Sequence, residues 1–361
     1  MSDAPDSAPR PLVNAPRLQV SHLSVAFHTD EGRVPAVSDV SFSIAPGRTT
    51  ALVGESGSGK SVTSLALMRL LPGSTHQTGT RQTVTGSARF IDREGTAVDL
   101  LSLPEARMRA LRGNQIAMVF QEPMSCLNPV FTVGEQIAES LRLHRRLDGH
   151  AAMAQALRML ELVEIPAAAQ RLAEYPHQLS GGMRQRVMIA LAMACEPTLL
   201  IADEPTTALD VTIQAQILML MRRLQHVTGM SILFVTHNLG VVAHHADEVA
   251  VMYAGRIVEA SAVRELFARP RHPYTQGLLA CLPAQQELAR GGTAGRRLKA
   301  IPGQVASPLR PPPGCAFAPR CAQVQERCAK AMPELLDDGE KRQTRCVLTL
   351  PAKQSLTEAT S

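Results

Sequence analysis

The chain has 361 residues, enough for about two domains of ~150 residues, and its 45% hydrophobic content is ordinary for a globular protein. The formal net charge of +5 is not concentrated in a compact lysine and arginine run, so charge does not single out nucleic acid or an anionic membrane as a partner. No apolar stretch reaches the ~18 residues that a membrane-spanning helix needs, so an integral membrane protein is not expected.

The N-terminal part of the chain changes character at about residue 17. Residues 1–16 are rich in Pro, Ala, Ser and Asp and lack the basic and apolar regions of a signal peptide, so they are predicted to be a disordered tail. Apolar runs at 18–20, 23–27 and 40–44 are separated by turn residues, a pattern typical of short strands.

Beyond Pro46 and Gly47, continuous apolar runs alternate with helical stretches. The runs are Thr49–Val53, Ile116–Phe120, Leu199–Ala202 and Ser231–Thr236. Such runs between helices indicate an α/β fold with a parallel sheet covered on both faces. Residues 132–194 read as mostly helical and are predicted to be a subdomain inserted into this core.

A glycine-rich loop follows the first of these runs. Gly54–Ser61 fits the phosphate-loop pattern G-x-x-x-x-G-K-[ST], with an apolar strand before it and a helix predicted at Val62–Leu71. In such a loop Lys60 reaches the β and γ phosphates and Ser61 ligates Mg²⁺, while the helix N-terminus favours an anion. The predicted nucleotide-contacting residues are Gly54, Glu55, Ser56, Gly57, Ser58, Gly59, Lys60, Ser61 and Val62.

Two acids end the apolar run at 199–202. Asp203 stands where a carboxylate can hold Mg²⁺ through water, and Glu204 stands where it can polarise an attacking water. Together with the phosphate loop, these acids predict an NTP-hydrolysing site.

The segment between the two motifs carries the specific resemblance. Leu179–Arg186 reads Leu-Ser-Gly-Gly followed by a basic helical stretch, which resembles the signature of the ABC ATPases. The order of motifs matches that family: the phosphate loop, a glutamine loop with Gln121, the signature, the acidic strand with Asp210 shortly after it, and a switch histidine, His237. Phe27 occupies the place where the family keeps an aromatic residue for adenine stacking.

The resemblance implies a role for each of these residues. Gln121 would contact Mg²⁺ or the water, Glu204 would be the catalytic base, and His237 would hold the γ-phosphate in its transition state. Lys60 completes the catalytic set.

The resemblance also implies a dimer. The amides of Ser180, Gly181 and Gly182 would cap the γ-phosphate bound to the opposite subunit, and Asp210 would act across the interface. A helix N-terminus with two glycines offers bare N–H groups to an anion, which gives this role a physical basis. Since the chain carries one phosphate loop and one signature, each complete site needs two chains.

Several further segments resemble the ATP-binding subunits of dipeptide and oligopeptide importers, namely 122–129, 271–279, 301–303 and the cysteine-bearing tail. This implies ATP-driven import at the cytoplasmic face of the inner membrane, with a second ATPase subunit (a paralogue), two transmembrane permease subunits and an extracytoplasmic substrate-binding protein, and no nucleic acid. Importers of nickel or another small solute, a soluble ABC ATPase and a catalytically dead subunit are the alternatives. The sequence leaves the substrate and the identity of the partner ATPase open.

Four of the seven cysteines lie in the proline-rich tail, at Cys315, Cys321, Cys328 and Cys346. Four thiols suit an iron–sulfur cluster or a structural Zn²⁺, although the close cysteine pairs of most zinc sites are absent, and unliganded thiols are a third possibility. The resemblance implies a [4Fe–4S] cluster. The remaining cysteines, Cys126, Cys195 and Cys281, are predicted to be ordinary thiols.

The resemblance thus predicts three regions. They are a tail (1–16), an ABC nucleotide-binding domain (17–265) with an antiparallel β subdomain and the helical subdomain (132–194), and a small irregular Cys-rich C-terminal domain (266–361).

Overall fold

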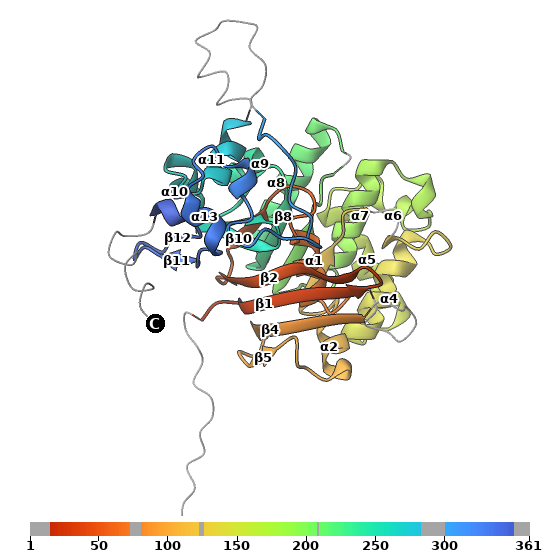
Figure 1. Cartoon of the computed structure of the whole chain (residues 1–361). Helices are drawn as coiled ribbons and strands as arrows, with labels where there is room; N and C mark the ends of the chain where they lie inside the picture. Colours follow the sequence, from red (N-terminus) through yellow and green to blue (C-terminus); the bar gives the residue numbers. More distant parts are fainter. Residues whose placement is uncertain (1–14, 73–80, 123–125, 208, 283–299, 350–361) are drawn as a thin grey trace, which may run out of the picture. The chain divides into compact units, whose positions relative to one another are not determined.

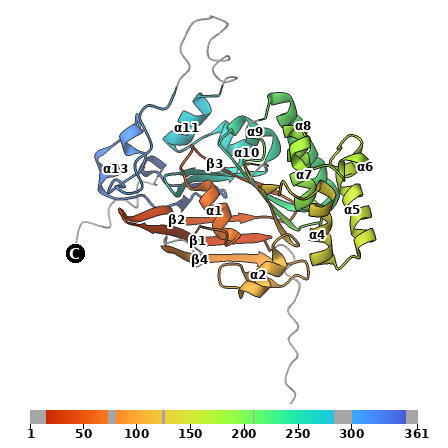
Figure 2. The same cartoon turned by 90° about the vertical axis from the view of Figure 1, so that its right-hand side faces the viewer.

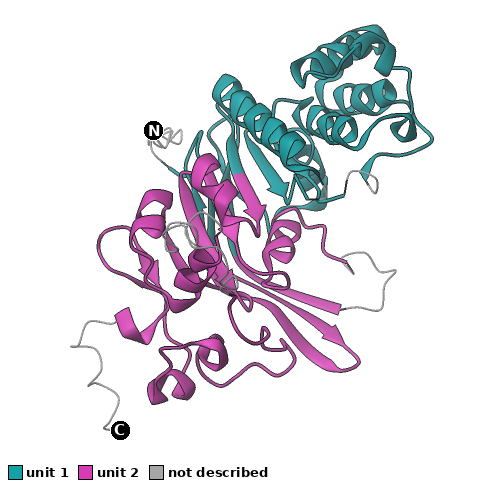
Figure 3. Ribbon diagram, turned by 90° about the horizontal axis from the view of Figure 1, so that it is seen from above, with its two compact units in different colours: residues 1–20, 43–48, 87–232 teal, residues 21–42, 49–86, 233–361 magenta. Residues whose placement is uncertain are grey.

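The computed structural model describes residues 15–72, 81–122, 126–207, 209–282 and 300–349 (Figure 1). Apart from its last two residues, the predicted tail lies outside this described part. Within the described residues, none of the helices has the length and apolar character needed to cross a membrane. The chain forms two compact units, coloured separately in Figure 3.

Unit 1 consists of residues 1–20, 43–48 and 87–232. Its elements are β5 (Ala97–Asp99), α2 (Glu105–Leu111), β6 (Ile116–Val119), α4 (Val133–Arg145), α5 (Gly149–Leu162), α6 (Ala168–Arg171), η1 (Pro176–Gln178), α7 (Gly181–Met193), β7 (Leu199–Asp203) and α8 (Val211–Thr228). Strands β6 and β7 pair in parallel, and helices α4 to α7 occupy the segment for which the sequence predicts a helical subdomain.

Unit 2 consists of residues 21–42, 49–86 and 233–361. Its elements are β3 (Thr49–Val53), α1 (Lys60–Leu67), α9 (Leu239–His245), β9 (Glu248–Tyr253), β10 (Arg256–Ala262), α10 (Val263–Ala268), α11 (Pro273–Ala280), η2 (Ala318–Arg320), α13 (Glu326–Lys330), β11 (Leu336–Asp337), β12 (Gln343–Thr344) and η3 (Val347–Thr349). The C-terminal segment is therefore part of this unit. Four strands pass from one unit to the other along the chain: β1 (Leu18–Thr29), β2 (Gly32–Ile44), β4 (Arg81–Ile91) and β8 (Ser231–Thr236).

The central strands are made of the continuous apolar runs. Every residue of β3, β7 and β8 is buried, as expected for strands covered on both faces. The predicted bounds of Thr49–Val53 and Ser231–Thr236 agree with β3 and β8, and the prediction of an α/β fold is confirmed.

The prediction of a parallel sheet is wrong in one respect, because the sheet is mixed. In unit 2 the strand order is β11-β12-β10-β9-β3-β8, and β3 pairs with β9 in parallel. Strands β9 and β10 are antiparallel because a two-residue turn joins them, with φ of 44° at Ala254 and 80° at Gly255. Two successive positive φ values are typical of a tight hairpin. Strands β12 and β11 extend this antiparallel edge.

The predicted break between the runs at 18–20 and 23–27 is also wrong, since both belong to β1. The strand continues through a local distortion instead of ending in a turn. His22 has φ of 51° and its Nδ1 lies 2.8 Å from Oδ1 of Asp39 in β2, whose φ is 54°. A Cβ at Gly86 in β4 would lie 2.6 Å from the carbonyl oxygen of His22, so a glycine is required beside the distortion.

Helix α1 is shorter at its C-terminal end than the predicted Val62–Leu71. It begins at Lys60 and ends at Leu67, because Arg69 adopts a left-handed φ of 52° and the N–H of Leu70 donates to the carbonyl of Leu65 at 2.8 Å. This pattern terminates a helix with its last carbonyls satisfied.

The C-terminal segment packs on the same core as the strands of unit 2. Phe317 contacts the rings of Tyr253 and Tyr274, with centroid distances of 5.3 and 5.4 Å. All three side chains are buried together with Val53 and Val251. In Figures 1 and 2 the blue C-terminal segment accordingly lies against α11 within this unit.

Candidate active site

The phosphate loop connects β3 to α1 in unit 2. Lys60 is buried, and its Nζ donates to the carbonyls of Gly54 and Glu55 at 2.8 and 3.0 Å. The ammonium group of Lys60 therefore lies inside the loop, against its backbone carbonyls. Ser56 and Gly57, at the outer end of the loop, are exposed. This arrangement places a positive charge and the N-terminus of α1 behind an accessible turn, as an anion site requires.

Two glycines of the loop are fixed by close backbone neighbours. A Cβ at Gly54 would lie 2.1 Å from the carbonyl oxygen of Met252, and one at Gly59 would lie 2.5 Å from that of Ala36. Gly59 also has φ of 98° and caps α1. No other residue type fits either position without movement of the backbone.

In unit 1, Glu204 follows β7 with a left-handed φ of 46°. Such a conformation is rare for a residue with a side chain and is often found at functional sites. Its Oε2 accepts hydrogen bonds from Thr207 Oγ1 at 2.9 Å and from Gln121 Nε2 at 3.4 Å. The structure therefore brings Gln121 and Glu204 together. Asp203, the last residue of β7, precedes Glu204 in the chain and is buried.

The signature segment forms the start of α7. Ser180 is its N-cap, with Oγ accepting from the N–H of Met183 at 3.4 Å. A Cβ at Gly181 would meet nothing within 4 Å, and one at Gly182 would lie 3.1 Å from Ile213. Gly181 is exposed and Gly182 is half-buried, so the start of this 13-residue helix has little side-chain cover, which suits an anion.

The other predicted site residues lie at element ends or edges. Asp210 is the N-cap of α8, where its Oδ1 accepts from the N–H of Ile213 at 2.9 Å, so it has a structural role whatever else it does. His237 is exposed directly after β8, and Phe27 is half-buried in β1.

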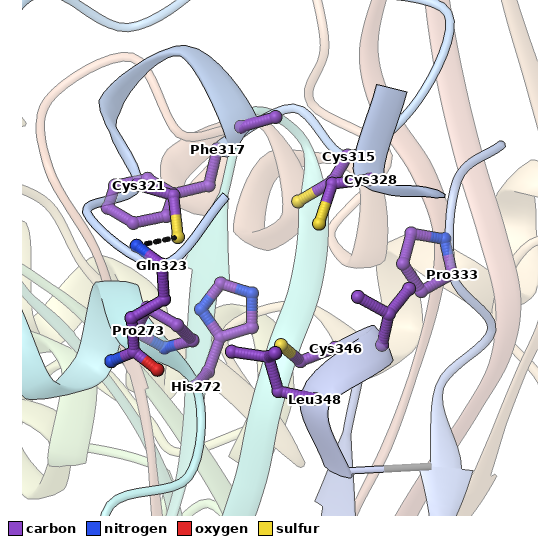
Figure 4. A pocket seen from close by; sticks show the side chains of 12 residues that line it. His272, Pro273, Cys315, Phe317, Cys321, Gln323, Cys328, Pro333, Cys346 and Leu348 are labelled. Carbon is purple, nitrogen blue, oxygen red and sulfur yellow. Dashed lines mark hydrogen bonds between the residues drawn. The ribbon is translucent and has the colours of Figure 1, made fainter. Parts of the chain in front are cut away.

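The four tail cysteines line one pocket in unit 2, together with His272 and Phe317 (Figure 4). Cys315 and Cys328 are neighbours, since the N–H of Cys315 donates to the carbonyl of Cys328 at 2.7 Å. Burial raises the pKa of the thiols of Cys315, Cys321 and Cys346. None of the seven cysteines, all of which lie in the described part of the chain, forms a disulfide.

The pocket fits a metal group in composition but not in spacing. Among the described residues, no three His, Cys, Asp or Glu side chains are close enough together to hold a metal ion. A metal group in this pocket would have to draw the thiols together and displace their protons, because thiolates are the ligands.

Beside this pocket is a network that the sequence did not predict. His272 is 1% exposed, and burial lowers its pKa to about 4, so the ring is neutral at physiological pH. Its Nδ1 accepts from the N–H of Tyr274 at 3.1 Å, which caps α11. Tyr274 Oη in turn accepts from the N–H of Glu55 in the phosphate loop at 2.9 Å. The segment 271–279 contained these residues, but nothing in it indicated contact with the loop.

Comparison with protein families gives two matches. The family described as ABC transporter matches residues 37–207, and the family described as oligopeptide/dipeptide transporter, C-terminal region, matches residues 258–328.

Curated relatives are similar over nearly the whole chain. A protein of Brucella ovis is 52% identical over 332 residues, which cover 92% of this chain and 97% of the relative. A protein of Brucella abortus is 49% identical over 343 residues, covering 95% of this chain and 98% of the relative. Both are named as peptide import ATP-binding proteins.

Solved structures are similar over the larger part of the chain. One is an ATP-binding cassette in a dimeric post-hydrolysis state with ADP and Pi, with a TM-score of 0.59, 26% identity and coverage of 68% of this chain and 99% of that one. Another is cbiO1 of Clostridium perfringens, part of an ABC transporter complex, with a TM-score of 0.58, 25% identity and coverage of 76% and 99%.

Proposed function

Because this chain belongs to the family of ABC transporter ATP-binding proteins, we propose that it hydrolyses ATP to power import of dipeptides or oligopeptides through a membrane permease. The observation that carries the proposal is the 52% identity to a peptide import ATP-binding protein over 92% of the chain. The match of residues 258–328 to the oligopeptide/dipeptide transporter C-terminal region supports the same substrate class.

The proposed chemistry is phosphoryl transfer from ATP to water. Lys60 would bind the β and γ phosphates from inside the loop, where it now contacts two carbonyls. Ser61, Gln121 and Asp203 would hold Mg²⁺, which when bound neutralises phosphate charge. Glu204 would accept a proton from the attacking water, and its bonds to Thr207 and Gln121 support this assignment because they fix the carboxylate.

The remaining site residues would complete the nucleotide site. His237 would hold the γ-phosphate, and Phe27 would stack on adenine. Ser180, Gly181, Gly182 and Asp210 would act on the nucleotide of a second ATPase subunit. Support for this dimeric site is the exposed, glycine-rich start of α7 and the dimeric state of a similar solved cassette.

We also propose that the chain is peripheral to the cytoplasmic face of the inner membrane, with two permease subunits, a paralogous ATPase and an extracytoplasmic substrate-binding protein as partners. Gentle solubilisation of native membranes, capture of the chain under anaerobic conditions and mass spectrometry test this. Two permeases, a second ATPase and a peptide-binding protein are expected. Recovery without any membrane protein contradicts the proposal and favours a soluble ATPase, and a binding protein for nickel would change the substrate class.

The cysteines of the C-terminal region are proposed to hold a [4Fe–4S] cluster, with Cys315, Cys321, Cys328 and Cys346 as ligands. The assignment is supported by the observation that all four cysteines line the same pocket. Such a cluster, when bound, would cross-link a proline-rich segment that contains little regular secondary structure.

Anaerobically purified protein is expected to contain about four iron atoms and four acid-labile sulfides per chain, in keeping with one cluster of this type. Cys328→Ser should lose most of both, whereas Cys281→Ser, outside the pocket, should lose neither. Wild-type protein without iron and sulfide, or equal iron in the two variants, contradicts the cluster.

A further inference from the structure

The second residue of the phosphate loop is held by the C-terminal segment. Arg320 Nη1 donates to Glu55 Oε2 at 2.7 Å, and Nη2 donates to Oε1 at 3.1 Å. The Arg320 side chain is 5% exposed and that of Glu55 is 28% exposed, so the pair is largely shielded from water. A bidentate guanidinium–carboxylate hydrogen bond of this kind is both strong and directional.

Arg320 is itself held in place. Its Nε donates to the carbonyl of Pro302 at 2.8 Å, and its Nη1 lies 3.4 Å from Tyr253 Oη. The guanidinium also stands over the rings of Tyr253 and Phe317, at 5.8 and 6.0 Å from their centroids. These contacts fix the side chain before any ligand arrives, so its position does not depend on Glu55 alone.

Glu55 places a carboxylate within the phosphate loop. A carboxylate in a loop that binds a polyphosphate repels the ligand, and partial burial strengthens the repulsion because little water screens it. Lys60 Nζ donates to the backbone carbonyl of Glu55 at 3.0 Å. Arg320, which lies 265 positions later in the chain, brings a positive charge into direct contact with this carboxylate.

We propose that Arg320 is a positioning residue for ATP, which acts through Glu55 by cancelling its charge and fixing the start of the phosphate loop. The inference rests on the proposed nucleotide site and extends it, because it gives the C-terminal segment a direct part in nucleotide binding. Arg320 does not contact the phosphates and leaves the hydrolysis step itself unchanged.

The test compares the dissociation constant of ATP, together with KM and kcat, for four full-length proteins. Arg320→Met exposes the phosphates to an unneutralised carboxylate and is expected to raise the dissociation constant and KM for ATP about tenfold, with kcat within about threefold of wild type. Adding Glu55→Gln to Arg320→Met removes the repelling charge and should restore affinity to within about threefold. Arg310→Met, which removes an exposed arginine of the same segment, is the matched control.

Each outcome decides the proposal. If wild type binds ATP and Arg320→Met binds it equally well, the inference is wrong while the proposed function stands. A double variant no better than Arg320→Met also overturns it, because the arginine then acts only by packing. If Arg320→Met does not fold, Arg320→Lys is tested instead, because lysine keeps the positive charge but cannot form the bidentate contact with Glu55. Its affinity should fall about threefold, and unchanged affinity would reject the positioning role. A wild-type protein that does not bind ATP removes the proposed function itself.

Discussion

Replacing Glu204 with Gln is expected to lower the ATP turnover of the purified subunit by at least about a hundredfold while leaving ATP binding intact. A general base contributes roughly 10²–10⁴-fold to a rate, and an amide has no basic carboxylate to accept the proton of water. The geometry of the site sharpens this expectation. Thr207 and Gln121 donate to the Glu204 carboxylate and orient it, and both contacts can be kept by the amide oxygen of Gln.

Phosphate release under saturating ATP and size-exclusion chromatography with ATP and Mg²⁺ are the two measurements. The Glu204→Gln protein should accumulate as an ATP-bound dimer, since closure precedes hydrolysis in the proposed cycle. Glu161→Gln, at an exposed position of α5, is the matched control and should turn over at the wild-type rate. Hydrolysis by Glu204→Gln at that rate would show that Glu204 is not the base.

Replacing Gly54 with Ala is expected to abolish measurable ATP binding and to lower the melting temperature by several degrees. The new Cβ would lie 2.1 Å from the carbonyl oxygen of Met252 and 2.7 Å from Ser58 Oγ, so the backbone must move. Overpacking of this kind costs about 1–3 kcal/mol of unfolding free energy. The same movement displaces the Gly54 carbonyl, to which Lys60 donates at 2.8 Å, and so disturbs the phosphate-binding ammonium.

Thermal unfolding and ATP titration of the purified variant check this expectation. Gly149→Ala is the control, because Gly149 is the first residue of α5 and an added Cβ there meets nothing within 4 Å. It should melt within about a degree of wild type. A Gly54→Ala protein that matches this control in both melting and ATP affinity would mean that the loop can relax more freely than its contacts indicate.

Much of the fold follows from local patterns. Fully apolar runs such as Thr49–Val53 and Ser231–Thr236 predict strands with correct bounds because burial on both faces leaves no polar position inside them. The errors occur where one residue adopts a left-handed backbone. At His22 the sequence pattern predicts a turn, but β1 continues past this residue. At Arg69 the left-handed backbone ends α1 earlier than the apolar pattern of the sequence suggests. Sequence patterns contain little signal for such single-residue conformations.

In the candidate site, too, some features could be predicted from the sequence and others could not. The residue type and order of the motifs predict that Gln121 and Glu204 belong to one site, and the structure places their side chains in contact. Their catalytic roles stay predictions. The ion pair between Arg320 and Glu55 could not be predicted from the sequence, because the two residues lie 265 positions apart. A single ion pair produces no periodic pattern or fixed spacing in a sequence.

The central claim, that this chain powers peptide import, is tested most directly by transport. The complex captured from membranes would be reconstituted in proteoliposomes with its binding protein, and uptake of labelled dipeptides and oligopeptides would be followed with ATP on the side of the ATPase. Uptake is expected with ATP, and none with a non-hydrolysable analogue or with Glu204→Gln in the complex. A complex that hydrolyses ATP and moves no peptide, but does move nickel or another small solute, would contradict the claim.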